Sequence, residues 1–195
     1  VDSVPLSPEN VYTNDTITAA VTTSDEDGDA LTVAYAWYVD GSIVGESGST
    51  ISGATYFDKD DAVHVVVTPS DGTDSGDSVA SDSITISNTA PSAPSVSIGP
   101  VEPIAGVDDI ICSIDSGSSD ADGDTVSYTI TWDVDGTAFT GATTTTRTGD
   151  TISADETNGD EEWTCTVTPN DGDDDGTAGT ASVTVQDCFE GWAST

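Results

Sequence analysis

Two short acidic segments carry the residues whose type and spacing best suit metal binding. Each places three aspartates at alternate positions around one glycine: Asp25, Asp27 and Asp29 around Gly28, and Asp120, Asp122 and Asp124 around Gly123. Calcium takes about six to eight oxygen ligands at flexible geometry, and a sharp turn of carboxylates supplies some of them. The spacing predicts calcium at each segment, with a solvated turn of Asp and Gly residues as the alternative.

The two acidic segments belong to an internal repeat. Residues 24–41 and 119–136 each contain the acidic segment, then an alternating run with one Trp, then an Asp-Gly pair. Such repetition indicates duplicated domains, and half of 195 residues is enough for one small domain. We expect two copies of one β domain, at 1–88 and 96–187, joined by a linker at 89–95 and followed by a tail at 188–195.

Apolar side chains at every second position predict half-buried strands in both copies. The clearest pair carries Leu31, Val33, Tyr35, Trp37 and Val39 in the first copy and Val126, Tyr128, Ile130, Trp132 and Val134 in the second. Asp40-Gly41 and Asp135-Gly136 then predict hairpin turns, because glycine accepts the positive φ that such turns need. About seven short strands per copy without a helical period predict a Greek-key β-sandwich.

The start of each copy contains two prolines, which predict a broken first strand. The copies align by eye with Val1 opposite Val96, and with Pro5 and Pro8 opposite Pro100 and Pro103. Between the copies, Pro91 and Pro94 predict a short, semi-rigid spacer. We therefore expect an all-β chain of two sandwiches in an end-to-end array.

The charge of the chain excludes several classes of partner. Two Lys and Arg stand against 37 Asp and Glu, a formal net charge of −35. This charge repels phosphates, which argues against nucleic acid and anionic membrane surfaces, and no apolar run is long enough to insert into a bilayer. Self-repulsion destabilises the compact state unless cations screen it.

Two cysteines of the second copy indicate an oxidising compartment. Cys112 and Cys165 stand at inward positions of two expected strands, and the first copy has Ala19 and Val65 at the matching places. Because both cysteines are replaced together by apolar residues, we predict a disulfide across the second sandwich, with two buried thiols as the alternative.

Cys112…Trp132…Cys165 resembles the Cys, Trp, Cys pattern of immunoglobulin-type (Ig-like) domains. Residues 158–165 resemble their Asp-x-(Gly/Ala)-x-Tyr-x-Cys segment, with Trp163 in place of Tyr. Trp-(Tyr/Asp)-Val-Asp-Gly partly matches the PKD pattern Trp-Asp-Phe-Gly-Asp-Gly. Nearly all of 1–187 is similar to the Ig-like, PKD- and cadherin-like modules of large secreted bacterial surface proteins, and the acidic segments resemble calcium loops of secreted bacterial repeats. The resemblance implies tandem Ig-like sandwiches at a bacterial cell surface.

In an Ig-type sandwich the loops after the second and sixth strands lie at one end. We therefore expect the acids after the sixth strand to complete the calcium sites: Asp71 and Asp74 in the first copy, and Asp171, Asp173, Asp174 and Asp175 in the second. The far end of the first copy is also acidic, through Asp58, Asp60 and Asp61. The cadherin-like resemblance implies a cation at the junction of the copies.

Three further features bear on partners. Cys188 is left unpaired, and with Phe189 and Trp192 it forms a tail that either docks on another subunit or begins a further module. Asn14 begins a glycosylation sequon. His64 is the only histidine and is expected on an outer face, where a single histidine is poorly placed for catalysis.

These observations predict a non-enzymatic extracellular structural protein, stiffened by calcium. It would serve as a stalk, surface-layer or self-assembling fibre subunit, with other copies or neighbouring modules as partners. The alternative is a carbohydrate-binding or spacer module of a secreted enzyme, for which Tyr38 is the best outward aromatic side chain. A third possibility is acid-rich solubility at high salt without bound calcium.

Overall fold

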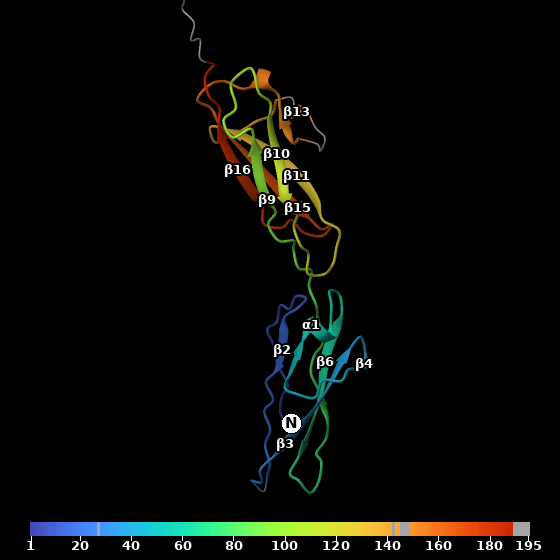
Figure 1. Cartoon of the computed structure of the whole chain (residues 1–195). Coiled ribbons are helices and arrows are strands. Elements are labelled where there is room, and N and C mark those ends of the chain that lie inside the picture. Colours follow the sequence, from blue (N-terminus) through green and yellow to red (C-terminus); the bar gives the residue numbers. More distant parts are fainter. Residues whose placement is uncertain (27, 142, 145–148, 189–195) are drawn as a thin grey trace, which may run out of the picture. The chain divides into compact units, whose positions relative to one another are not determined.

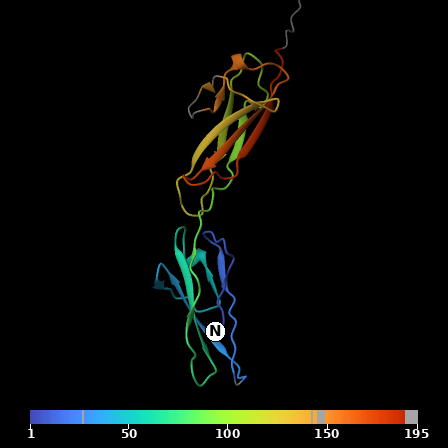
Figure 2. The same cartoon turned by 180° about the vertical axis from the view of Figure 1, so that it is seen from behind.

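The computed structural model describes residues 1–26, 28–141, 143–144 and 149–188. The chain forms two compact units, unit 1 (Val1–Thr89) and unit 2 (Ala90–Thr195). Both are β-sandwiches of antiparallel strands, as Figures 1 and 2 show. The prediction of an all-β chain with two tandem sandwiches is confirmed.

Unit 1 consists of two packed sheets. One has the order β1-β2-β5, with bounds Leu6–Ser7, Thr16–Ala19 and Thr50–Ser52. The other has the order β4-β3-β6-β7, with bounds Ser42–Ile43, Thr32–Val39, Ala62–Ser70 and Val79–Ala80. A further strand, β8 (Ile84–Thr85), also pairs with β6. This division of strands between sheets is that of an Ig-type Greek key.

Unit 2 repeats the arrangement with one more strand in its first sheet. That sheet has the order β13-β14-β10-β9, with bounds Thr143–Thr144, Thr151–Ile152, Ile110–Ser116 and Ser95–Gly99. The second sheet has the order β12-β11-β15-β16, with bounds Thr137–Ala138, Ser127–Val134, Glu162–Asn170 and Gly179–Thr184. The long pair β11–β15 corresponds to β3–β6 of unit 1, so the same strands carry the Trp in both units.

The two predicted Asp-Gly hairpins are present. Asp40 and Gly41 have φ of 50° and 73°, and Val39 pairs with Ser42 across the turn. Asp135 and Gly136 have φ of 49° and 73° in the matching turn of unit 2. Positive φ at both central residues is the two-residue turn whose twist matches that of the flanking strands.

Two short helical segments, α1 (Gly53–Tyr56) and η1 (Ala154–Glu156), follow the strands β5 and β14. They are single turns and carry no periodic pattern, which is why the sequence did not indicate them. Gly53 is required by close packing, since a Cβ there would lie 2.8 Å from the backbone N of Asn14. In the part of the chain that is described, neither helix has the length and hydropathy to cross a membrane.

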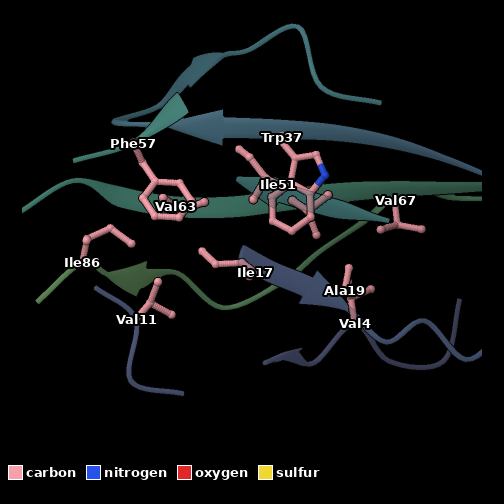
Figure 3. Close-up of a cluster of buried hydrophobic side chains, with 11 residues drawn as sticks. Val4, Val11, Ile17, Ala19, Trp37, Ile51, Phe57, Val63, Val67 and Ile86 are labelled. Atoms are coloured by element: carbon pink, nitrogen blue, oxygen red, sulfur yellow. The ribbon is translucent and has the colours of Figure 1, made fainter. Parts of the chain in front are cut away.

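Each unit has its own hydrophobic core around a Trp from the long strand pair. In unit 1, Trp37 is 0% exposed, and its Nε1 donates a hydrogen bond to the Gly48 carbonyl oxygen at 2.9 Å. Figure 3 shows Trp37, Val63 and Ile17 pointing into the space between the sheets. In unit 2, Trp132 is 3% exposed and donates in the same way to Gly149, at 2.7 Å.

A disulfide joins Cys112 and Cys165, the pair predicted from the sequence. Cys112 lies on β10 in one sheet and Cys165 on β15 in the other, so the bond crosses the core of unit 2. Both residues are buried, next to Trp132 and Trp163 in the same cluster. In unit 1 the corresponding Ala19 and Val65 are also buried, so each unit fills this part of its core with small or branched side chains.

The alignment of the first strands predicted from the prolines is wrong by three residues. Leu6 pairs with Ala19 in unit 1, and Ile98 pairs with Cys112 in unit 2. Because Ala19 and Cys112 are equivalent, Leu6 corresponds to Ile98, and by the same register Val4 rather than Val1 corresponds to Val96. By this register Pro8 corresponds to Pro100, whereas Pro5 and Pro103 have no proline at the matching place of the other copy.

Part of the segment predicted as a linker packs on the second sandwich. Pro91 and Pro94 are buried, and Ser95 already belongs to β9. The backbone N–H of Ser92 donates to the carbonyl oxygen of Ser119 at 2.9 Å.

Candidate metal centre

The loop between β10 and β11 brings three predicted ligands together in unit 2. Carboxylate oxygens of Asp120, Asp122 and Asp124 all lie within 4.8 Å of one another, and the three residues are half-buried. Asp120 Oδ1 builds the turn by accepting the backbone N–H groups of Asp122 (2.9 Å) and Asp124 (3.1 Å). Gly123 has φ of 80°, a conformation that glycine adopts without a steric penalty. The alternating spacing thus folds into one compact carboxylate cluster.

The other oxygen of Asp120 lies in an electrostatically unfavourable environment within this cluster. Asp120 Oδ2 is shielded from solvent and has no hydrogen-bond partner. A buried polar group left without a partner costs about 1–3 kcal/mol, and more when it is charged. Neighbouring carboxylates also repel one another. A bound cation would relieve both effects, and an all-oxygen donor set fits calcium better than a soft transition metal.

The matching loop of unit 1 has the same turn but is more exposed. The backbone N–H of Asp29 donates to Asp25 Oδ1 at 3.0 Å, and Gly28 has φ of 81°. Asp25 and Asp29 are both exposed, whereas their counterparts in unit 2 are half-buried. Asp27, the third predicted ligand, lies outside the described residues. Among the residues that are described, a group of three carboxylates close enough together to hold one metal ion is found only in unit 2.

The acidic loops after β6 and β15 use their first aspartate to hold their own turns. Asp71 Oδ1 accepts the N–H groups of Thr73 (2.7 Å) and Asp74 (2.8 Å). These bonds, that from Asp74 foremost, hold the pKa of the Asp71 carboxyl below its ordinary value. Asp171 Oδ1 likewise accepts from Asp173 and Asp174, both at 2.8 Å.

The expected convergence of the two loops is only partly visible. In unit 1, Asp25, Asp71 and Asp74 line one groove, so both acidic loops reach the same end of the sandwich. In unit 2, within the described residues, Asp171 and Asp173 do not join the group formed by the loop before β11.

The acids at the other end of each sandwich build the turn that leads into the long central strand. Asp61 Oδ2 accepts the N–H of Asp58 at 2.8 Å, and Asp60 has φ of 70°. In unit 2, Glu161 Oε2 accepts from the Asn158 backbone N–H (2.8 Å) and from Trp163 Nε1 (3.0 Å).

Burial and hydrogen bonding have opposite effects on the pKa of the Glu161 carboxyl at this turn. Partial burial raises its pKa, but hydrogen bonds from Asn158 and Trp163 outweigh that effect and hold the pKa below its usual value. These acids at the far ends therefore have a structural role in their own turns.

The remaining predicted contact residues lie on the surface or outside the description. Cys188 is a free, exposed thiol that donates to the carbonyl oxygen of Ala105. Phe189 and Trp192 lie outside the described residues. Asn14 is exposed, with φ of 73°, in the turn before β2.

Tyr38 and His64 face each other on the outer surface of β3 and β6. Their rings stack with centroids 4.9 Å apart and an interplanar angle of 6°. The sequence indicated that both side chains point outward, and their cross-strand pairing explains the stack. One face of the Tyr38 ring is therefore covered by His64.

One feature of unit 1 was not anticipated: a groove of about 580 Å³ beside the first acidic loop. Pro69 and Gly76 form part of its wall. No local pattern in the sequence indicated this groove.

No protein-family model matches this chain, and no curated protein sequence matches it significantly. Among solved structures, three N-terminal domains of the highly immunogenic outer capsid protein of bacteriophage RB49 align at 19% identity, with a TM-score of 0.36, over 95% of this chain and 58% of theirs. The chicken interferon gamma receptor alpha chain aligns at 9% identity and a TM-score of 0.49, over 94% of this chain and 97% of the receptor chain. A calcium-stabilised adhesin with which an Antarctic bacterium binds ice aligns at 18% identity, with a TM-score of 0.37, over 89% of this chain and 44% of the adhesin chain.

The chain thus spans little more than half of the phage protein structure and less than half of the adhesin structure. Because these identities and TM-scores are low, the assignment of a role depends on the residues of this chain.

Proposed function

We propose that this chain is a non-enzymatic structural segment of an extracellular surface protein, and that calcium bound at its acidic loops stabilises it. The observation that carries the calcium proposal is the cluster of Asp120, Asp122 and Asp124, together with the buried Asp120 Oδ2. The three carboxylates supply part of the oxygen set that calcium takes, and backbone carbonyls or water would supply the rest.

The extracellular placement is supported by the disulfide between Cys112 and Cys165, because such bonds persist in oxidising compartments. The structural role is supported by the architecture of the units. Each unit has its own hydrophobic core and a tight Asp-Gly turn. The only histidine of the sequence, His64, stacks on Tyr38 at the surface. A formal charge of −35 also makes counter-cations part of the stability of the chain.

Calcium added to chelator-treated protein is expected to raise the melting temperature of unit 2. A ligand at about 100 times its Kd stabilises the native state by about 2.7 kcal/mol, which raises the melting temperature of a domain of this size by roughly 10–20 °C. Asp120→Asn should abolish most of this shift. Asparagine keeps an oxygen that can accept from Asp122 and Asp124, so the turn survives while one carboxylate is lost. Differential scanning calorimetry in buffered micromolar calcium measures the effect.

Asp171→Asn is the matched control, because Asp171 holds a similar turn but is outside the cluster. It should leave the calcium response unchanged. Equal calcium responses in the wild type and Asp120→Asn would contradict the site. Stabilisation by sodium chloride at high concentration, without a response to micromolar calcium, would instead support simple charge screening in an acid-rich protein.

Calcium is also expected to promote association between copies of the chain. Without divalent cations, the negative charge should keep copies apart, and calcium should lower that repulsion. Light scattering after size exclusion and electron microscopy, each with and without calcium, measure this. Cys188→Ser is needed as a background, because the exposed thiol can form intermolecular disulfides. Calcium-dependent filaments support a fibre subunit, and monomers under all conditions contradict self-assembly and leave the role of a spacer.

A further inference from the structure

The larger sheet of unit 1 has an apolar outer face, although the chain as a whole is strongly acidic. Trp37 on β3 and Val65 on β6 are buried, so the residues that alternate with them point away from the core. Six such residues on β3, β4, β6 and β7 carry no carboxylate. We call them the unit 1 outer face, and they are Ala36, Tyr38, Ile43, His64, Val66 and Ala80.

Three large side chains of this face form a ridge across the strands. Tyr38 pairs with Ile43 of β4 on one side and with His64 of β6 on the other. The rings of Tyr38 and His64 stack with centroids 4.9 Å apart, and Ile43 is 66% exposed. Because Tyr38 is flanked on both sides, the ridge presents side-chain edges, which suit an apolar protein surface better than the flat ring of a sugar.

A shallow floor of smaller side chains lies next to the ridge. Two residues before Tyr38 on β3, Ala36 pairs with Val66, and Val66 pairs in turn with Ala80 of β7. Successive outward residues of a strand are about 7 Å apart, so the ridge and the floor are adjacent rows. The face therefore has a step from large to small side chains.

The matching face of unit 2 is polar. Trp37 pairs with Val65 as Trp132 pairs with Cys165, and these pairs align the two sheets. By this register the counterparts of all the face residues except Ile43 are polar, and they are Thr131, Asp133, Thr164, Thr166 and Thr180. The fold thus forms without apolar side chains at these positions. Their presence in unit 1 indicates a contact with something outside the unit.

The charge of the chain narrows the choice of partner. A basic partner would bind at the acidic loops, since the unit 1 outer face has no carboxylate to attract it. The 37 acidic residues of the chain all lie outside this face and repel another copy. At this face, two copies can make contact without bringing carboxylates together.

We propose that the unit 1 outer face is the site of a two-fold contact between two copies of this chain. A two-fold axis that runs across the strands, between the two rows, lays the ridge of each copy over the floor of the other. Tyr38 then packs on the partner's Ala36, and His64 packs on the partner's Val66. The contact goes beyond the proposed calcium-dependent association, because it uses a sheet face and not the acidic loops.

The size of the face sets the strength of the contact. Strands about 4.8 Å apart and residues about 3.4 Å apart give roughly 300–500 Å² for each copy. Stable complexes bury about 800 Å² on each partner, so we expect a weak and reversible dimer. Such a contact becomes effective where many copies are held close together, because each contact then raises the effective concentration for the next.

Sedimentation equilibrium of the full chain tests the contact in chelator, so that calcium plays no part. A Cys188→Ser background removes intermolecular disulfides. Sodium chloride at about 1 M shortens the Debye length to about 3 Å, which screens the acids but not an apolar contact. We expect monomers at low salt and a monomer–dimer equilibrium at high salt. A chain that stays monomeric at high salt and high protein concentration would overturn the proposal, and would leave the face to another kind of partner, such as a polysaccharide.

Exchanging residues of the face for their unit 2 counterparts locates the contact. The variant is Tyr38→Asp with His64→Thr and Val66→Thr, and unit 2 already folds with these residues at the matching positions. We expect association at high salt to weaken by about tenfold or more, because the apolar ridge is lost. The melting temperature and hydrogen exchange at β6 verify that unit 1 stays folded.

Two further variants separate the face from a general effect of charge or of substitution. Ile43→Ser with Val66→Thr adds no charge and should still weaken the dimer by about threefold or more. Asp133→Asn with Thr166→Ser changes the matching face of unit 2 and should leave the dimer unchanged. A dimer that survives both unit 1 variants, or that is lost in the unit 2 variant, would overturn the proposal. Neither result bears on the calcium sites, because all these measurements are made in chelator.

Discussion

Replacing Cys112 by Ala and Cys165 by Val is expected to lower the free energy of unfolding of unit 2 by about 4 kcal/mol. The two cysteines are 53 residues apart in the sequence, and closing a loop of that length restricts the unfolded chain by about this amount. A small domain of limited core has an unfolding free energy of only about 5–15 kcal/mol. The disulfide therefore accounts for a large share of the stability of unit 2.

The substitutions are chosen so that packing changes little. Unit 1 has Ala19 and Val65 at the same places, both buried in a core built around an equivalent Trp. Urea denaturation of the full chain, followed by hydrogen exchange, measures each unit separately, and unit 1 serves as the internal reference. Reduction of the wild type should reproduce the loss. A loss below about 1 kcal/mol would show that the crosslink contributes little beyond filling its site.

Most of the fold was readable from the sequence because the decisive patterns are local. Alternation around Trp37 and Trp132 defines the central strands, and each Asp-Gly pair supplies the positive φ that closes the next hairpin. The paired replacement of Cys112 and Cys165 indicated a contact between the sheets. The first strands were misaligned because Pro-x-x-Pro recurs in both copies, while the true register is set by the pairing of Leu6 and Ile98 with the next strand.

The candidate site was predictable only at the level of one loop. Spacing alone suffices to gather Asp120, Asp122 and Asp124, since Asp120 Oδ1 closes the turn on its neighbours. Asp71 and Asp171 were each expected to complete the calcium site of their own copy, but their carboxylates accept hydrogen bonds from their own loops. Local geometry decides whether such a carboxylate holds its own turn or binds a metal ion, and the sequence does not show that geometry.

The packing of Pro91 and Ser92 on unit 2 could not be predicted, because it depends on bonds to Ser119, which is distant in the sequence. Pro91 and Ser92 read as a spacer in the sequence, since prolines between domains are typical of linkers. Only the bonds between Ser92 and Ser119 show that these residues belong to the second sandwich.

Trp37→Ala is expected to destabilise unit 1 by about 3–5 kcal/mol and to leave unit 2 unchanged. Trp37 is 0% exposed at the centre of the unit 1 core, so truncation removes its packing and leaves a cavity between the sheets. It also deprives the Gly48 carbonyl oxygen of its hydrogen bond from Nε1. Because unit 1 has no disulfide within its described residues, this loss should bring it close to unfolding at room temperature.

Tyr38→Ala is the matched control, because Tyr38 follows Trp37 on β3 and points to the opposite face. Loss of its stack on His64 should cost only about 1 kcal/mol. Hydrogen exchange at β6 reports on unit 1 and exchange at β15 on unit 2, so neither depends on the fluorescence of the Trp that is removed. A Trp37→Phe variant, which keeps most of the apolar volume but not the Nε1 donor, should fall between the two. If Trp37→Ala cost no more than Tyr38→Ala, or if it also destabilised unit 2, the separate Trp-centred core assigned to each unit would be wrong.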